Sequence, residues 1–158
     1  MEGAIIRRAA VADADGILEC LREAFEPFRN DYTKGAYEDT VLAKDSLSRR
    51  LSEMTVLVAV DRAGKVMGTV ACKVSGDGEG HLRGMAVLPE CQGCGIAHQL
   101  LERAEGELIA AQCSCVTLDT TEPLERAMRF YERHGYRRSG RTQDFFGMRL
   151  IEYGKRLA

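Results

Sequence analysis

The sequence predicts a mixed α/β (α+β) fold, in which a mostly antiparallel sheet of six to seven strands is flanked by about four helices. Three observations predict it. Runs of β-branched residues alternate with glycine-containing turns over residues 55–88. A glycine-rich turn then joins an apolar strand to a long amphipathic helix, and a further apolar strand follows that helix. The 158 residues are expected to form one domain, 1–158.

The first third of the chain predicts one strand followed by helices. Residues 4–9 are apolar and extended in character, and residues 12–25 carry apolar side chains at helical spacing. Pro27 is expected to end this helix, because proline lacks the amide that a helix interior needs. Residues 28–54 have weaker periodicity and predict a second helical segment, whose continuity the pattern leaves open.

An antiparallel meander is expected next. The strand-like runs 55–60 and 66–74 are joined by a short glycine-containing turn, which predicts a hairpin. Residues 75–80 are rich in glycine and interrupt the pattern, and residues 81–88 resume it up to Pro89.

The second half begins with a helix of about seventeen residues after Gly95. A short strand follows at 115–120, and the order strand, helix, strand implies a right-handed crossover between parallel strands. Residues 124–134 predict another helix, capped by Gly135, and residues 145–153 a final strand.

Composition excludes several classes of partner. The net charge is -2, with both signs scattered, and lacks the basic surplus of a nucleic-acid-binding protein. No run of 18 apolar residues is present, so no membrane partner is expected. Residues 1–4 lead into a strand rather than a signal sequence. We therefore expect a cytoplasmic protein.

The six cysteines do not predict a metal site. Cys91 and Cys94 precede the long helix and Cys113 and Cys115 follow it, so the pairs lie roughly 25 Å apart at about 1.5 Å per residue. Zinc needs every sulfur at about 2.3 Å. A redox role for Cys91 and Cys94 stays open, because a thiol near a helix N-terminus can have a lowered pKa.

The turn before the long helix is the most informative segment. Gly93 and Gly95 have no Cβ to obstruct a ligand, and the first amides of the helix lack intrahelical acceptors. Together with the positive end of the helix, these amides make a site for phosphate or pyrophosphate. A glycine pair alone also serves ordinary turns.

Two segments together resemble the GNAT (GCN5-related) N-acetyltransferase superfamily. Gln92, Gly95 and Ala97 match the family's pyrophosphate loop, in which Gln or Arg is followed by two variable residues, Gly, one variable residue, and Gly or Ala. Residues 127–136 resemble its second hallmark, a helix that carries a tyrosine and ends in glycine and an aromatic residue. The resemblance is strong over residues 81–136.

The resemblance implies acetyl-CoA (coenzyme A) as the cofactor, wedged between two parallel strands that splay apart. The strand before the loop would pair with the pantetheine through Met85, Ala86 and Val87, which are equally ordinary sheet residues. Loop amides would bind the pyrophosphate. The loop residues expected to bind the cofactor are Gln92, Gly93, Cys94, Gly95, Ile96, Ala97 and His98.

The resemblance implies that Tyr131 is the general acid that protonates the departing CoA sulfur. A phenol with a pKa near 10 keeps its proton at neutral pH, as this role requires. Tyr131 also fits core packing, because it shares the inward face of its helix with Ala127 and Met128. Many family members carry Asn where this chain has Leu124, so one contact with the cofactor is lost or supplied elsewhere.

His81 is our hypothesis for the base that deprotonates the acceptor amine. The period of two places it on the same strand face as Arg83 and Met85, and histone-acetylating family members place a glutamate at the matching position. A histidine pKa near 6.5 suits proton acceptance. A solvated histidine at a strand start fits equally well, and Glu79 or a water relay is the reserve.

These features predict an enzyme, an acetyl-CoA-dependent N-acetyltransferase that moves acetyl directly to the primary amine of a small molecule. The alternatives are a peptide or protein acetyltransferase, acting on an N-terminus or a lysine, and a non-catalytic acyl-CoA sensor. A homodimer formed through sheet edges or C-terminal strands is compatible with the family. The identity of the amine lies beyond the sequence.

Overall fold

The computed structural model describes residues 3–157. Met1 and Glu2, the first residues of the segment 1–4 discussed above, lie outside the described residues. The strands are β1 (Ile5–Arg8), β2 (Thr55–Val60), β3 (Val66–Gly76), β4 (Glu79–Val87), β5 (Cys115–Thr121), β6 (Arg137–Phe145) and β7 (Met148–Arg156). The helices are α1 (Ala14–Phe25), α2 (Lys34–Thr40), α3 (Lys44–Glu53), α4 (Ile96–Ala110) and α5 (Glu125–Arg133).

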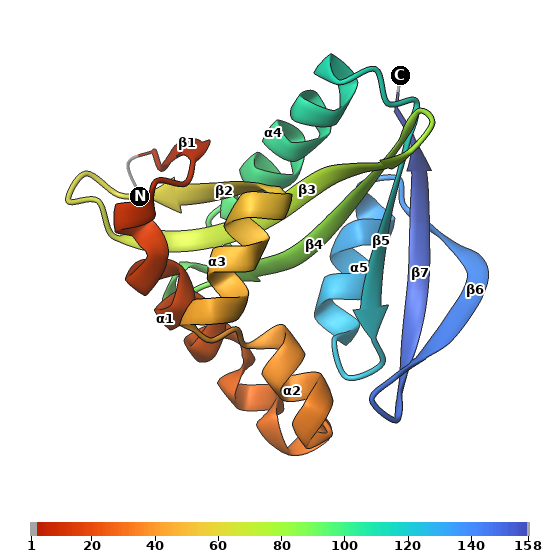
Figure 1. The fold of residues 1–158 in the computed structure, drawn as a ribbon, viewed down its shortest axis with the longest axis horizontal. Coiled ribbons are helices and arrows are strands. Elements are labelled where there is room, and N and C mark those ends of the chain that lie inside the picture. Colours follow the sequence, from red (N-terminus) through yellow and green to blue (C-terminus); the bar gives the residue numbers. More distant parts are fainter. Residues whose placement is uncertain (1–2, 158) are drawn as a thin grey trace.

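All seven described strands belong to one mixed sheet, in the order β1-β2-β3-β4-β5-β7-β6 (Figure 1). β4 and β5 pair in parallel, and every other neighbouring pair is antiparallel. The crossover from β4 through α4 to β5 is the strand, helix, strand unit expected from the sequence. The predicted α/β class and mostly antiparallel sheet are confirmed.

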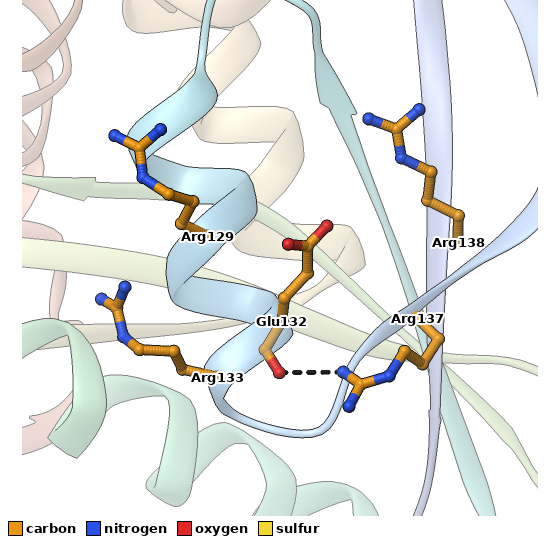
Figure 2. Close-up of a pocket in the computed structure, with 5 residues that line it drawn as sticks. All are labelled: Arg129, Glu132, Arg133, Arg137 and Arg138. Atoms are coloured by element: carbon orange, nitrogen blue, oxygen red, sulfur yellow. Dashed lines mark hydrogen bonds between the residues drawn. The ribbon is translucent and has the colours of Figure 1, made fainter.

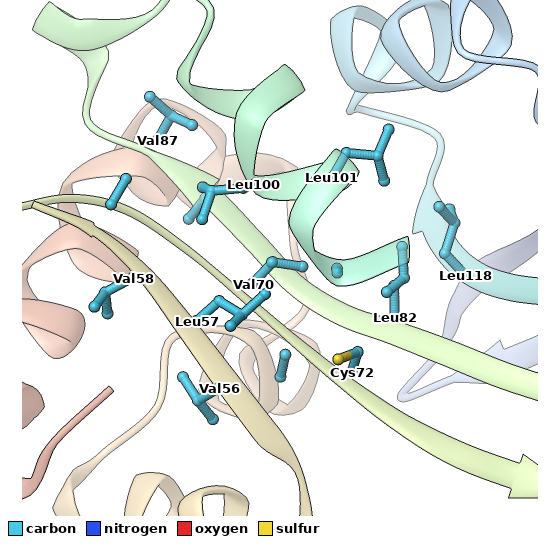
Figure 3. Packing of buried hydrophobic residues seen from close by; sticks show 14 of the residues in the cluster. Val56, Leu57, Val58, Val70, Cys72, Leu82, Val87, Leu100, Leu101 and Leu118 are labelled. Atoms are coloured by element: carbon cyan, nitrogen blue, oxygen red, sulfur yellow. The ribbon is translucent and has the colours of Figure 1, made fainter. Parts of the chain in front are cut away.

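The helices form a layer on each face of the sheet. α1 and α3 pack on β2, β3 and β4 from one side, and α4 packs on the same strands from the other (Figure 1). Figure 3 shows Leu100 and Leu101 of α4 beside Val70 and Leu82 of the sheet, and all four are at most 3% exposed. Burying each such side chain contributes about 1.5–3 kcal/mol.

α5 is tied to α4 and β7 by polar contacts just past its end. Tyr136, which is fully buried, donates its hydroxyl proton to the Glu105 carboxylate of α4 at 2.7 Å. The Lys155 ammonium of β7 contacts the same carboxylate at 3.0 Å. Gly135 ends the helix with a left-handed φ of 91°, which glycine adopts without steric cost.

The weakly periodic segment 28–54, whose continuity the sequence left open, contains two helices, α2 and α3. Thr33 begins α2 by accepting a hydrogen bond from the Ala36 amide at 3.3 Å. α3 begins after Ala43, whose amide donates to the Ser46 hydroxyl at 2.9 Å. These short helices bring the number of α-helices in residues 3–157 to five, one more than expected.

The final strand was predicted about three residues too early, and the strand that precedes it was missed. A strand was expected at 145–153, but Phe146 and Gly147 form the turn between β6 and β7, with φ of 50° and 87°. Positive φ at both central residues is the geometry of a tight hairpin turn. β6 was missed because its polar, exposed residues carry no apolar alternation, as suits a strand at the sheet edge.

Candidate active site

β4 and β5 pair along half of their length and then separate. Glu79–Leu82 of β4 pairs with Cys115–Leu118 of β5. Beyond this point β4 continues to Val87 beside β3, while β5 continues to Thr121 beside β7. The facing edges of the two strands therefore lack a strand partner over their last residues, which leaves backbone hydrogen-bonding groups available to a ligand. The separation implied by the resemblance is present.

A β-bulge lies where the strands begin to part. Arg83 pairs with Ala71 and Ala86 with Thr69, so two residues of β4 oppose one residue of β3. Gly84 in the bulge has a φ of 68°, in the left-handed region that favours glycine. A bulge bends its strand and increases the local twist, which turns the end of β4 away from β5.

The bulge also changes which side chains of β4 share a face of the sheet. Before it, Gly80 faces α4, since a Cβ there would meet Leu108. After it, Val87 also faces α4, since its partner Gly68 does. An even-numbered and an odd-numbered residue thus share one face. The expectation that Met85 lies on the same face as His81 and Arg83 is wrong, because the bulge shifts the period of two by one residue.

The loop between β4 and α4 presents free backbone amides. Gly93 and Gly95 have φ of 84° and 83°, and a Cβ at either would meet no atom within 4 Å. The first intrahelical bond runs from the Gln99 amide to the Gly95 carbonyl at 3.1 Å. The amides of residues 96–98 therefore precede the helical ladder, and none of the described carbonyls accepts from the amides of residues 93–95.

Gln92 contributes through its side chain. Its backbone amide donates to the Pro89 carbonyl at 3.3 Å. The side-chain amide nitrogen donates to the Val87 carbonyl at 3.2 Å, and its oxygen accepts from Arg126 of α5 at 3.0 Å. Gln92 thus fixes the loop between the end of β4 and the start of α5.

A cavity of about 810 Å³ runs from this loop through the gap between the strands. At the loop it is lined by the two glycines and His98, in the gap by Met85, Thr120 and Tyr131, and beyond it by α1, α2 and α3. The Thr120 hydroxyl oxygen is buried without a hydrogen-bond partner in the structure. Free amides, unpaired strand edges and this hydroxyl fit an elongated diphosphate ligand with amide groups, as coenzyme A is.

His81 lies beside β5, at the end of the paired region. Its Nδ1 is 2.8 Å from the Thr117 hydroxyl, and its Nε2 is 3.6 Å from an Asp119 carboxylate oxygen. Burial lowers the pKa of His81. The positive charges of Lys73 and Arg83 lower it further, whereas the carboxylates of Asp119 and Glu152 raise it. Burial raises the pKa of Asp119. The ring is therefore neutral at pH 7 and has a carboxylate close by.

Of the two base candidates, His81 lines the cavity and Glu79 does not. Glu79 is exposed at the start of β4, where its carboxylate contacts the Ser75 hydroxyl at 3.4 Å. Thr117 and Asp119 were not predicted from the sequence as partners of His81. The period of two along residues 115–121 would have placed both on one strand face, but their pairing partner was not known from the sequence.

Tyr131 lines the cavity from α5. Its ring packs edge-on against Phe130 and Tyr136, with centroids 5.5 and 5.8 Å away. None of residues 3–157 forms a hydrogen bond with its hydroxyl in the structure. Burial raises the pKa of this phenol, so it keeps its proton across the physiological range.

The two cysteines near the loop differ in environment. Cys91 is buried and lines the cavity, and burial raises the pKa of its thiol instead of lowering it. Cys94 is exposed. No disulfide joins cysteines in residues 3–157, and no three potential ligand side chains there gather at a metal-like site. In the same range, no helix has both the length and the apolar composition of a membrane span.

A second hollow, of about 620 Å³, lies on the outer side of α5. It is lined by Arg129, Glu132, Arg133, Arg137 and Arg138. Figure 2 shows that their guanidinium groups do not converge on one point, and that Arg137 is bonded to the Glu132 backbone carbonyl at 2.9 Å. This open surface lacks the arrangement of amides and titratable groups found in the main cavity.

Comparison with known proteins agrees with this geometry. The model of the acetyltransferase (GNAT) family matches residues 15–136. A GNAT-family acetyltransferase from Staphylococcus aureus Mu50 is similar in fold, with a TM-score of 0.79 at 15% identity, over 98% of this chain and 99% of that one.

Two further structures share the fold at low identity. The PaiA N-acetyltransferase of Thermoplasma acidophilum, solved in complex with coenzyme A, has a TM-score of 0.78 at 20% identity, over 97% of this chain and 98% of that one. The ribosomal-protein-S18-alanine N-acetyltransferase of Escherichia coli has a TM-score of 0.75 at 16% identity, over 98% of this chain and 94% of that one.

Proposed function

Because the chain belongs to the GNAT family of acetyltransferases, we propose that it transfers the acetyl group of acetyl-CoA to a primary amine of a small molecule. The observation that carries this proposal is the continuous cavity, which links free amides before α4 to a half-buried histidine and a buried tyrosine at the strand gap. Acetyl-CoA supplies an activated acyl thioester, and the chain's own residues hold the donor and move protons.

The amides of residues 93–98 bind the pyrophosphate, and the unpaired edge of β4 binds the pantetheine amides. The acceptor amine arrives protonated, because alkyl amines titrate near 10. With its proton on Nδ1 and donated to Thr117, His81 has a free lone pair on Nε2 for the amine proton. Asp119 then stabilises the imidazolium, and Tyr131 donates its proton to the departing thiolate.

The closure of the acceptor end supports a small molecule over a peptide. The turn between β6 and β7 reaches across to the segment before α2, where the Thr33 hydroxyl donates to the Phe146 carbonyl at 2.7 Å. The Tyr32 hydroxyl is hydrogen-bonded to the Thr121 hydroxyl of β5 at 2.6 Å. These bridges narrow the approach along which an extended peptide would enter.

A thiol-release assay tests this function. Purified protein with acetyl-CoA is offered small primary amines, lysine peptides and peptides with free N-termini. Release of CoA with small amines, and acetylated amine in the product, is the expected result. Turnover with peptides alone would overturn the small-molecule acceptor. Binding of CoA with no release on any amine would overturn catalysis in favour of an acyl-CoA sensor.

A further inference from the structure

A half-buried arginine, Arg50, lines the acceptor end of the cavity. Arg50 lies in the last turn of α3, and its guanidinium reaches the bulge in β4, where a Cβ at Gly84 would lie 2.6 Å from Arg50 Nη1. Both residues line the cavity. Glycine at this position therefore gives the guanidinium access to the strand surface beside the candidate base.

The Arg50 guanidinium has no partner for its charge. Among residues 3–157 no carboxylate forms an ion pair with it and no acceptor forms a hydrogen bond with it. Burial lowers the pKa of Arg50 to about 10, the nearby Arg83 charge adds to this, and Asp39 opposes it. A guanidinium with five donors, held largely out of water and unpaired, is costly unless a ligand supplies an anion.

The neighbouring charges indicate how much negative charge the anion should carry. Arg83 of β4 is paired with Asp39 of α2 at 2.5 Å, so these two charges cancel. Arg50 adds one uncompensated positive charge. A single positive charge matches a carboxylate, which a guanidinium binds through two parallel hydrogen bonds. It repels polycationic amines.

Arg83, whose charge lies near that of Arg50, is close to the candidate base along β4. Arg83 lies two residues after His81 and on the same strand face, and such residues are separated by about 7 Å along a strand. The cavity lining also includes the rings of Phe25, Phe28 and Tyr32. One cavity thus combines the candidate base, an unpaired arginine and apolar rings.

We propose that the acceptor is an amine that also carries a carboxylate, such as an α-amino acid with an apolar side chain, and that Arg50 binds that carboxylate. This inference rests on the proposed function. Arg50 is then a specificity-determining residue, and no sequence pattern identified it.

The experiment compares substrates that differ in the anionic group alone. Phenylalanine, its carboxamide, phenethylamine and the phosphonate analogue of phenylalanine are assayed by CoA release with wild type, Arg50→Gln and Arg50→Lys. Arg49→Gln is the matched control, since Arg49 is exposed on the same helix and lies outside the cavity lining. Calorimetry with CoA present measures phenylalanine binding without turnover.

We expect wild type to prefer phenylalanine over its carboxamide by roughly 10-fold or more in kcat/KM, the size of one charged hydrogen-bonded contact. Arg50→Gln should abolish that preference and weaken phenylalanine binding while turnover of the carboxamide persists. Arg50→Lys should retain part of the preference, and Arg49→Gln should retain all of it.

Equal loss on phenylalanine and carboxamide in Arg50→Gln would overturn the inference, as would a preference of wild type for phenethylamine or the phosphonate. In each of those results CoA is still released, so they would contradict this inference without contradicting the proposed function. Absence of CoA release on every amine would instead contradict the proposed function itself.

Discussion

At the scale of single residues, the site depends on two groups whose protonation is set by burial. His81 is held neutral between β4 and β5, and Tyr131 is held protonated on α5. In these protonation states the imidazole has a lone pair that can accept a proton, and the phenol has a proton to give. Both were candidates from the sequence and both line the cavity, whereas no sequence pattern placed Thr117 and Asp119 beside the histidine.

Replacing His81 with Gln should lower kcat/KM by roughly 10²-fold, within the range for a general base. Because the pKa of His81 is lowered, the acid limb of the wild-type pH profile should fall below the ordinary value of about 6.5. In His81→Gln that limb should vanish, and the rate should rise with pH toward the amine's own pKa. Steady-state kinetics from pH 5 to 10 measure this.

Glu79→Gln is the control for this variant, because Glu79 lies two residues away on the same strand and outside the cavity lining. Its profile should match that of wild type. An unchanged acid limb in His81→Gln, or a lost one in Glu79→Gln, would reject His81 as the base.

Replacing Tyr131 with Phe should lower kcat by roughly 10²-fold and leave KM for acetyl-CoA nearly unchanged. The ring contacts with Phe130 and Tyr136 are kept, and the hydroxyl has no hydrogen-bond partner in residues 3–157 whose loss would destabilise the fold. Thermal unfolding should therefore be close to that of wild type. A fall in Tm with kcat unchanged would identify Tyr131 as a packing residue.

At the scale of elements, the site is made by two departures from regular structure, the bulge in β4 and the left-handed glycines before α4. Gly95→Ala tests the second. Alanine at a φ of 83° costs about 1–2 kcal/mol, and relief of this backbone strain would shift the amides that follow it. Calorimetry should show CoA binding weakened by roughly 10-fold or more.

Gly106→Ala provides the matched control on the same helix. Gly106 lies inside α4, and a Cβ there would meet no atom within 4 Å. Alanine should stabilise the helix by about 0.5–1 kcal/mol and leave CoA affinity unchanged. If both variants bind CoA as wild type does, the loop is an ordinary turn.

The sequence predicted elements with a clear apolar period and missed those without one. β2, β3, β5 and α4 lie within a few residues of their expected positions. β2 and β3 are continuous apolar runs rich in β-branched residues, β5 alternates buried and partly exposed residues, and α4 has a helical apolar period. β6 has a run of exposed polar residues, and its identity as a strand follows from pairing with β7. The bulge in β4 depends on register with β3, which no local pattern encodes.

At the scale of the whole molecule, the cavity joins segments far apart in the chain. Its donor end comes from β4, α4 and α5, which the glycine loop and the tyrosine helix predicted together. Its acceptor end comes from α1, α2, α3 and the ends of β6 and β7 next to their turn. Arg50 and Asp39 escaped prediction because their role depends on which strand residues they reach, and weak periodicity gave no register for α2 and α3.

We expect coenzyme A to bind in the gap between β4 and β5 and to the amides before α4. Amide hydrogen exchange measured with and without saturating CoA tests this binding mode. CoA should slow the exchange of amides in residues 93–98 and 85–87, whereas inorganic pyrophosphate should affect the loop alone. If CoA leaves these amides unchanged, or protects only the arginine-lined hollow on α5, the account is contradicted.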